Sequence, residues 1–222
     1  MEKFLGVLFC GGRGKRLGEI TKYISKSFIP VYNKPVFKYG LELLENSNYI
    51  DDIVILTNDE NNEKLKQTGY TTIIQDDEVV FDMFSGWEYI KKHIKTKQNG
   101  VLTPSDNVSN ISIDKLINKY MKDNTHLVFS IYEVNNRDKL KEMGCYDMKS
   151  KIYYYKNQAP KSKYGVIAPY IIDNSIDCTR GDQLFNHVNS SICKHNGYWF
   201  DLGDYQSIIM ANNFIADNHV SI

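Results

Sequence analysis

The chain has 222 residues, and 27 lysines and arginines balance 27 aspartates and glutamates, so the formal net charge is zero at pH 7. That balance favours neither nucleic acid nor an anionic membrane as a partner, and 42% hydrophobic with 13% aromatic residues is typical of a globular chain. No apolar run reaches the ~20 residues of a membrane span, no charged-then-apolar leader opens the chain, and four scattered cysteines indicate reduced thiols, so we expect a cytoplasmic protein.

Strand patterns and helix patterns alternate along the chain. We expect strands at 4–10, 52–56, 71–75, 101–103, 126–134, 152–156 and 164–172. We expect helices at 35–46, 60–67, 79–94, 113–121 and 208–215, the fourth of them capped by Ser112. Because this alternation is typical of a sheet with helices on both faces, the sequence predicts an α/β fold with a mixed, mainly parallel sheet. The length suits one domain, which we expect to span residues 1–222.

The most informative segment is the glycine-rich loop after the first strand. Gly11, Gly12 and Gly14 lack the Cβ that would keep a ligand away from the backbone, and successive N–H groups in such a loop form an anion-binding concavity. Arg16 and Lys26 add two cations that suit a polyphosphate. The sequence therefore predicts a site for a nucleoside triphosphate.

Three other interpretations of this loop are available. A P-loop requires G-x-x-x-x-G-K-[ST], which the chain lacks. A dinucleotide fingerprint requires G-x-G-x-x-G, and the glycines here read G-x-G-x-x-x-G, one residue too long. The third alternative is an ordinary glycine turn with surface charges, which the ordered arginine, lysine and Pro30 make less favoured.

The segment L-F-C-G-G-R-G-K-R-L-G-E-I-T-K-Y-I-S-K-S-F-I-P-V at 8–31 resembles the sugar-1-phosphate nucleotidyltransferases. Their signature is G-G-x-G-[TS]-R-L followed by a lysine and a proline, and residues 17–35 are similar to the glucose-1-phosphate thymidylyltransferase branch. The resemblance is strong over 4–40, patchy in the middle, and returns over 156–215. It implies the Rossmann-like nucleotidyltransferase fold, with the glycine loop and Arg16 binding the triphosphate and supporting the departing pyrophosphate. Lys26 would also bind phosphate, and Lys15 replaces the usual Thr or Ser.

Two aspartates are candidate ligands for Mg²⁺, which is usually held by one or two carboxylates plus substrate phosphates. Asp106 follows a strand in T-P-S-D-N, and Asp201 lies in W-F-D-L-G-D-Y. The resemblance implies a metal pair, because the family has G-D-N or G-D-D at the first place and W-x-D-x-G at the second. Ser105 stands in place of the family's glycine, and we place Asp204 outside the ligand set. The alternative for each aspartate is a turn residue that caps a neighbouring N–H.

The nucleobase pocket matches the family less closely. The resemblance implies that Gln75 reads the base, and a side-chain amide can both donate to and accept from a base edge. The alternative is a strand-end glutamine that faces water. Val80 replaces the family's glycine against which the base packs, so thymine specificity does not follow.

The acceptor pocket departs further from the family. The resemblance implies that Tyr146, Lys156 and Val166 contact the acceptor. The family's Tyr-Gly pair reads Tyr146-Asp147 here, and its Glu-Lys-Pro triplet reads Tyr155-Lys156-Asn157. The alternative for Lys156 is an ordinary surface lysine. Because lost hydrogen bonds to sugar hydroxyls change which analogue fits, the acceptor need not be glucose 1-phosphate.

The resemblance therefore implies a Mg²⁺-dependent nucleotidyltransferase that makes an NDP-sugar and pyrophosphate, with dTTP and glucose 1-phosphate as the first expectation. A related enzyme that uses CTP, UTP or GTP with another phosphorylated acceptor is the first alternative. An alternative of another class is a non-catalytic, nucleotide-binding regulatory subunit. The resemblance also implies a homo-oligomer, because relatives commonly form dimers or tetramers.

Overall fold

The computed structural model describes residues 2–156, 159–179 and 181–218. Its strands are β1 (Phe4–Phe9), β2 (Pro30–Val31), β3 (Lys34–Pro35), β4 (Ile50–Thr57), β5 (Thr71–Ile74), β6 (Asn99–Pro104), β7 (Asn107–Ser109), β8 (Leu127–Glu133), β9 (Gly144–Asp147), β10 (Ile152–Tyr155), β11 (Tyr164–Ile172), β12 (Ser190–His195) and β13 (Trp199–Asp201). Its α-helices are α1 (Phe37–Glu45), α2 (Asp59–Lys66), α3 (Met83–Ile94), α4 (Ile113–Asp123), α5 (Arg137–Glu142) and α6 (Tyr205–Asn218). Three 3₁₀ segments are η1 (Lys15–Lys22), η2 (Lys26–Phe28) and η3 (Gly181–Asn186).

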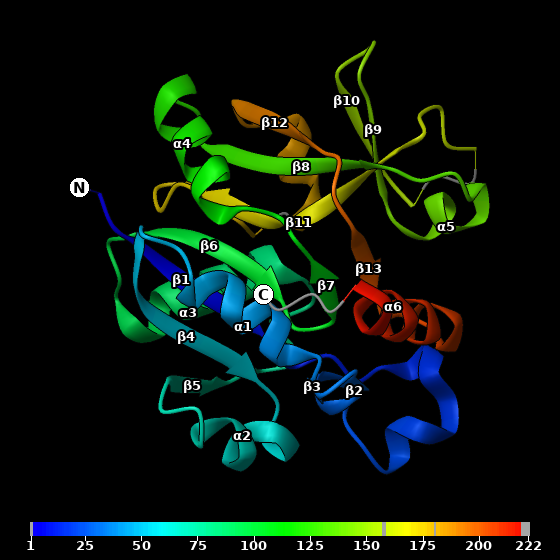
Figure 1. Cartoon of the computed structure of the whole chain (residues 1–222). Helices are drawn as coiled ribbons and strands as arrows, with labels where there is room; N and C mark the ends of the chain where they lie inside the picture. The colour runs from blue at the N-terminus through cyan, green and yellow to red at the C-terminus, as the bar shows by residue number, and fades with distance from the viewer. Residues whose placement is uncertain (1, 157–158, 180, 219–222) are drawn as a thin grey trace.

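One mixed sheet of nine strands organises the molecule (Figure 1). Its order is β10-β9-β11-β6-β1-β4-β5, and β8 lies beside both β11 and β12. The strands β6, β1, β4 and β5 run parallel, as do β8 and β12, whereas β11 is antiparallel to β6, β8 and β9. The mixed α/β sheet with covering helices is thus confirmed.

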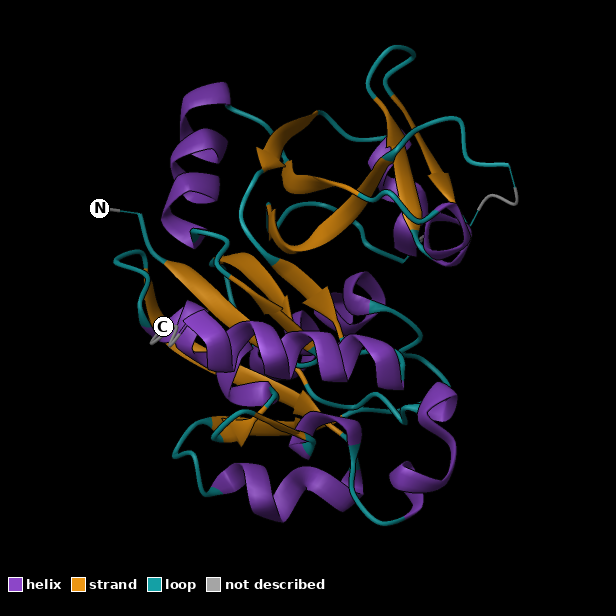
Figure 2. Ribbon diagram, turned by 45° about the vertical axis from the view of Figure 1, so that its right-hand side comes forward, coloured by secondary structure: helices purple, strands orange, loops and turns teal. Residues whose placement is uncertain are grey.

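The helices cover both faces of the sheet (Figure 2). Successive side chains of a strand point to opposite faces, and β1 follows this rule. Phe4 and Leu8 pack with α1 and α4 on one face, whereas Leu5 and Val7 pack with α3 and η3 on the other. A smaller apolar cluster joins α6 to β2 and β7. In the described part of the chain, no helix has the length and apolar character needed to cross a membrane.

Helix α3 begins later than the sequence pattern predicts, at Met83 rather than at 79. The reason is a capping box: the Asp82 carboxylate accepts from the Ser85 N–H at 2.7 Å, and the Ser85 hydroxyl accepts from the Asp82 N–H at 3.0 Å. Residues 79–81 are consequently released from the helix. The predicted Ser112 cap of α4 is confirmed by its bond from the Lys115 N–H at 3.3 Å.

The sheet topology positions the candidate site. Because β1, β4, β5 and β6 are parallel, their carboxyl ends lie at one edge of the sheet (Figure 1). The glycine loop follows β1, Gln75 follows β5, and Asp106 follows β6. The antiparallel pair β7–β13 then brings Asp201, from the far end of the chain, beside Asn107. Such an edge is where open α/β sheets bind ligands.

Candidate functional site

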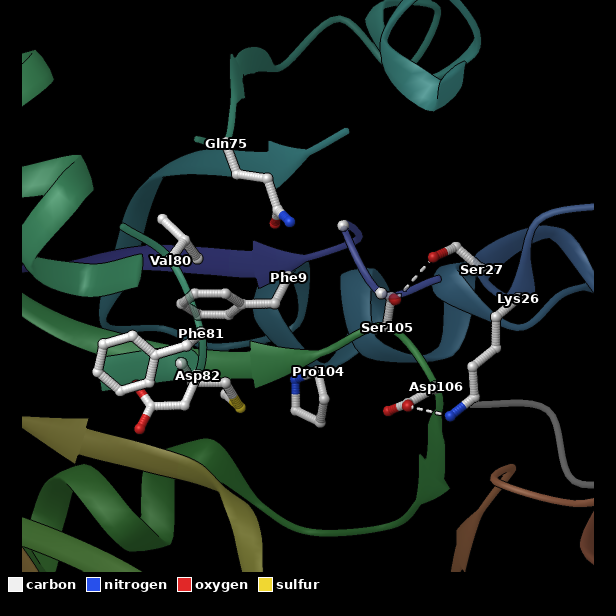
Figure 3. Close-up of a pocket in the computed structure, with 13 residues that line it drawn as sticks. Phe9, Lys26, Ser27, Gln75, Val80, Phe81, Asp82, Pro104, Ser105 and Asp106 are labelled. Atoms are coloured by element: carbon white, nitrogen blue, oxygen red, sulfur yellow. Dashed lines mark hydrogen bonds and ion pairs between the residues drawn. The ribbon is translucent and has the colours of Figure 1, made fainter. Parts of the chain in front are cut away.

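A cavity of about 330 Å³ opens at this edge of the sheet (Figure 3). Residues from the ends of β1, β5 and β6, from η2 and from the segment before α3 line it: Phe9, Gly11, Gly12, Lys26, Ser27, Gln75, Val80, Phe81, Asp82, Met83, Pro104, Ser105 and Asp106. The cavity has one apolar wall and one charged end. It can therefore hold a flat apolar group at one side and an anion or a metal at the other.

The glycine loop is shaped by two close approaches. A Cβ on Gly11 would lie 1.8 Å from the Gln75 Oε1, so the Gln75 side chain occupies the space that any other residue would need. Gly14 has φ +60, in the left-handed region that favours glycine, and its Cβ would lie 2.8 Å from the Thr21 side chain. Gly12 lines the cavity and faces open space. These placements leave the backbone of the loop accessible to a ligand.

Gln75 and Gly12 also line a second cavity, of about 370 Å³, which therefore adjoins the first. The Gln75 Nε2 donates to the Asp77 Oδ1 at 2.6 Å, and the Asp77 Oδ2 pairs with the Arg13 guanidinium. Sequence reasoning missed Arg13 and Asp77, because Arg13 lies at the variable position of the glycine signature and Asp77 is one of several acidic residues in its segment. Hydrogen bonding to Gln75, and then to Arg13, holds the pKa of the Asp77 carboxyl below its usual range.

The apolar wall combines the segment before α3 with the last residues of β1 and β6 and the first residue of α3. Val80, Phe9 and Pro104 line the cavity there (Figure 3), and Met83 lines it as well. Phe81 also lines it and is 70% exposed, which leaves its ring available at the mouth. Val80, at the position where the resemblance implies a glycine, adds apolar surface to this wall.

The charged end is formed by Lys26 and Asp106. The Lys26 ammonium pairs with the Asp106 Oδ2, and the two side chains are 10% and 29% exposed (Figure 3). Beside them, the hydroxyls of Ser27 and Ser105 form a hydrogen bond of 2.9 Å, and both residues are buried. Ser105, which departs from the family's glycine, is thus held in the floor of the cavity by a hydroxyl partner.

A backbone hydrogen bond holds the segment of Asp201 beside Asp106. The Leu202 N–H donates to the Asp106 carbonyl at 2.9 Å, which extends the β7–β13 pair. Burial raises the pKa of Asp201, and the neighbouring Asp106 carboxylate raises it further, while Lys26, Lys139 and Arg16 act in the opposite direction. Two neighbouring carboxylates that repel one another fit a divalent cation.

Two carboxylates are too few to hold a metal whose ligands all come from the protein, but they fit Mg²⁺. No group of three or more His, Cys, Asp or Glu side chains that could hold a metal occurs within 2–156, 159–179 and 181–218. Mg²⁺ characteristically takes one or two carboxylates and completes its shell with water and substrate phosphates. Asp106 and Asp201 are the residues that would hold it.

Arg16 faces a different cavity, of about 220 Å³, which also contains Asp201 and Asp204. The Arg16 guanidinium donates to the Glu142 carboxylate at 2.9 Å. A Cβ on Gly203 would lie 2.7 Å from the Arg16 Nη2, so this close approach requires glycine or a shift of Arg16. The structure thus brings Arg16 to Asp201 and α5, beside the main cavity rather than into its wall.

Lys139 and Met143 also line this cavity of about 220 Å³, and they were not predicted from the sequence. The Lys139 ammonium lies 5.0 Å from the centroid of the Trp199 ring, next to the strand that carries Asp201. Asp204 accepts from the Ser207 N–H at 2.7 Å at the start of α6, which holds the Asp204 pKa low. Asp204 therefore serves as a cap of α6. Its exclusion from the metal ligands stays a prediction.

Of the three acceptor candidates, Tyr146 and Val166 lie in one apolar cluster and Lys156 lies outside it. Tyr146 and Val166 are 6% and 7% exposed and pack in the apolar cluster under α3 and η3. Lys156 is exposed, has φ 42, and stacks its ammonium 4.9 Å from the Tyr155 ring centroid. In β9 both Cys145 and Tyr146 are buried, in two different apolar clusters, and the residue that pairs with Tyr155 across the hairpin is Gly144. Their contact with an acceptor stays a prediction.

Comparison with known proteins gives one family. The model of the family described as "Nucleotidyl transferase" matches residues 5–176. A bifunctional sugar-1-phosphate nucleotidylyltransferase/acetyltransferase from Sulfurisphaera tokodaii is 26% identical over 96% of this chain and 56% of its own length. A glucose-1-phosphate thymidylyltransferase from Neisseria meningitidis is 25% identical over 95% of this chain and 82% of its own length. The chain thus spans about half of the first of these relatives.

Solved structures share the fold. A Bacillus anthracis protein that carries the provisional name glucose-1-phosphate thymidylyltransferase superposes with a TM-score of 0.82 at 18% identity, over 99% of this chain and 97% of that one. A UDP-glucose pyrophosphorylase from Acinetobacter baumannii superposes with a TM-score of 0.76 at 15% identity, over 99% and 95% of the two chains. At this level of identity the likeness establishes the architecture.

Proposed function

The chain belongs to the nucleotidyl transferase family, and we propose that it transfers a nucleotide from a nucleoside triphosphate to a sugar 1-phosphate. An oxygen of the acceptor phosphate forms a bond to the α-phosphorus, the bond from that phosphorus to the bridging oxygen breaks, and pyrophosphate leaves with the electron pair. Both substrates are polyanions, so the reaction needs charge neutralisation and in-line positioning more than covalent catalysis.

The observation that carries this proposal is the gathering of phosphate-binding and base-binding groups around one cavity. Gly11 and Gly12 offer backbone N–H groups, Gln75 offers its amide, and Lys26 and Asp106 form the charged end. The apolar wall is the right kind of surface for a nucleobase, and the charged end suits the phosphates. In this arrangement Lys26 exchanges its Asp106 partner for a phosphate oxygen when the nucleotide binds.

We propose that Asp106 and Asp201 hold Mg²⁺ together with the substrate phosphates. The cation would supply neutralisation of the phosphate charge. The β7–β13 pair and the bond from the Leu202 N–H to the Asp106 carbonyl bring the two residues together, and Lys26 would move from Asp106 to phosphate.

Arg16 is proposed to stabilise the departing pyrophosphate. Its guanidinium has a planar set of donors that suits phosphate oxygens, and its present partner, Glu142, is an exposed carboxylate that a more highly charged anion would displace. On the acceptor side, Lys156 is proposed to bind the phosphate of the sugar, and Tyr146 and Val166 are proposed to contact the acceptor.

The first substrate pair that we propose is dTTP with glucose 1-phosphate. The reason is that this chain matches a glucose-1-phosphate thymidylyltransferase over most of the length of both proteins. The substitutions Val80 and Tyr155 favour a second candidate, a nucleotidyltransferase of the same class with CTP, UTP or GTP and another phosphorylated acceptor. Both candidates use the same triphosphate and metal groups.

A pyrophosphate-release screen tests the proposal. The purified protein with Mg²⁺ is given dTTP, UTP, CTP, GTP or ATP, each against a panel of sugar 1-phosphates and other small phosphate monoesters. Release with dTTP and glucose 1-phosphate supports the first pair, and release with another pair supports the second candidate. Triphosphate binding without release from any pair contradicts the proposed activity and favours a non-catalytic, nucleotide-binding subunit.

A further inference from the structure

A chain of two interactions lies behind the candidate base-reading residue. The Gln75 Nε2 donates to the Asp77 Oδ1 at 2.6 Å, and the Asp77 Oδ2 pairs with Arg13. We propose that Asp77 and Arg13 are positioning residues that hold the Gln75 amide in one orientation, and that this orientation decides between keto and amino nucleobases. This inference rests on the proposed function, because the base would occupy the cavity that Gln75 lines.

The orientation of the amide follows from the chemistry of its neighbour. An ionised carboxylate accepts hydrogen bonds and donates none, so the atom of Gln75 that faces Asp77 has to be the Nε2. The Oε1 then lies on the loop side, where a Cβ on Gly11 would approach it to 1.8 Å. Figure 3 shows the amide end of Gln75 directed from β5 toward the loop after β1. The Oε1 and the second hydrogen of the Nε2 remain for a ligand.

A fixed amide discriminates between two classes of base. Uracil and thymine present an acceptor at position 4 and a donor at position 3, whereas cytosine presents a donor at position 4 and an acceptor at position 3. An amide that rotates by half a turn exchanges its own donor and acceptor, and it can therefore pair with either order. An amide that is anchored at the Nε2 pairs well with one arrangement of donor and acceptor at base positions 3 and 4. With the opposite arrangement it leaves hydrogen-bonding groups unmatched, which costs affinity.

Arg13 holds the Asp77 carboxylate in the position from which it binds Gln75. Both Asp77 oxygens are engaged, one by Gln75 and one by Arg13, so the carboxylate bridges the glycine loop to the segment after β5. The side chains of Arg13 and Asp77 are 67% and 42% exposed. Exposed ion pairs contribute little to stability, so their replacement tests orientation without unfolding the protein.

The experiment measures dissociation constants for nucleotide pairs that differ at the discriminating edge, UTP with CTP and dUTP with dCTP, by calorimetry on the full chain with Mg²⁺. Wild-type protein is expected to prefer one member of a pair. In Asp77→Ala the ratio of the two constants is expected to move toward one by about five- to ten-fold, the effect of one hydrogen bond. Gln75→Ala should lose the same preference, and the double variant should lose no more than either single variant.

The isosteric variant Asp77→Asn gives the sharpest test. Arg13 would hold the new side chain by its oxygen, so the Asn amino group would face Gln75 and require the Oε1 in return. The Gln75 amide would then turn over, and the preference within the pair should shift toward the base that wild-type protein disfavours. A residue that only supported the loop would not change the ratio when its shape is kept.

A matched control is Glu63→Ala, which removes the exposed Lys66–Glu63 ion pair of 2.6 Å on α2 and should leave the ratio unchanged. Wild-type protein without a preference, or an unchanged ratio in both Asp77 variants, overturns this inference while pyrophosphate release still supports the function. A shifted ratio without pyrophosphate release supports the inference and contradicts the function. Absence of any triphosphate binding by wild-type protein overturns both.

Discussion

The Arg16 guanidinium donates to the Glu142 carboxylate at 2.9 Å and thereby ties the segment after the glycine loop to α5. The two side chains are 57% and 64% exposed, so water screens their attraction and the pair is easily exchanged. Arg16 also lies close to Gly203 and to the carboxylate of Asp201. A pyrophosphate at this position would gain the guanidinium that Glu142 now holds.

Replacement of Arg16 by alanine should lower the rate of pyrophosphate release by about 100-fold or more, as removal of a donor to developing charge does in other enzymes. The free energy of unfolding should change by less than about 1 kcal/mol, because the ion pair is exposed. Steady-state kinetics and urea unfolding measure the two effects. As a control, Glu142→Ala frees the guanidinium and should leave the KM for the triphosphate equal or lower; near wild-type turnover by Arg16→Ala would contradict the assignment.

Replacement of Gly11 by alanine should displace Gln75, because the new Cβ would lie 1.8 Å from the Oε1. Gln75 is held by Asp77 from the other side, so the collision moves the amide away from the cavity. We expect the KM for the triphosphate to rise more than the kcat falls. Gly12→Ala is the control, because its Cβ points into open space and leaves Gln75 in place. The two variants should have similar stability and differ in the position of Gln75. An unchanged KM in Gly11→Ala would show that Gln75 does not contact the nucleotide.

The sequence predicted the long strands of the main sheet, parallel and antiparallel alike, and missed shorter ones such as β9, β12 and β13. Buried parallel strands are continuous apolar runs, such as the one at β1, and they can be recognised without tertiary information. Strand β12, by contrast, reads Ser-Ser-Ile-Cys-Lys-His with mostly half-exposed side chains, and β13 has three residues. Neither segment has a period that distinguishes a strand from a loop. Their pairing with β8 and β7 depends on the folded chain.

The site residues also divide into those that local sequence can place and those that it cannot. Groups that follow a strand directly, such as Asp106, can be placed at the sheet edge from the chain order alone. The partners Glu142 and Lys139 come from α5, about 120 residues after the loop, and no local pattern connects them to Arg16. The burial of Tyr146 has no local signal, because its neighbour Cys145 is buried as well and β9 shows no alternation of buried and exposed residues.

Asp106→Asn and Asp201→Asn should each abolish Mg²⁺-dependent pyrophosphate release, because the proposed metal position would lose one of two charges. Without Mg²⁺, Asp201→Asn should be at least as stable as wild-type protein, since it removes a half-buried carboxylate beside Asp106. Thermal unfolding with and without MgCl₂ separates these effects: Mg²⁺ should raise the unfolding temperature of wild-type protein and not of the variants. Ca²⁺ is the control ion, since it binds carboxylates in larger shells. Mg²⁺-dependent turnover by either variant would contradict the metal assignment.

Asp173, remote from the site, should make stability depend on pH. Burial raises its pKa, but hydrogen bonds from the Ser175 N–H at 2.8 Å, the Ser175 hydroxyl at 2.7 Å and the Tyr120 hydroxyl at 3.2 Å outweigh burial, so the pKa lies below the ordinary 3.8. A carboxyl with a lowered pKa in the folded state stabilises it fully above the unfolded value, and this contribution is lost as the pH falls through the folded value.

Asp173→Asn should therefore unfold more easily than wild-type protein at neutral pH, by about 1 kcal/mol, and the difference should shrink as the pH falls below 3.8. Urea unfolding at a series of pH values measures it. Ser175→Ala is the matched control: it removes the hydroxyl donor and keeps the backbone donor, so it should show a smaller difference with the same direction of pH dependence. A difference that grows as the pH falls would mean that Asp173 is held in its protonated form, against the hydrogen bonds that it accepts.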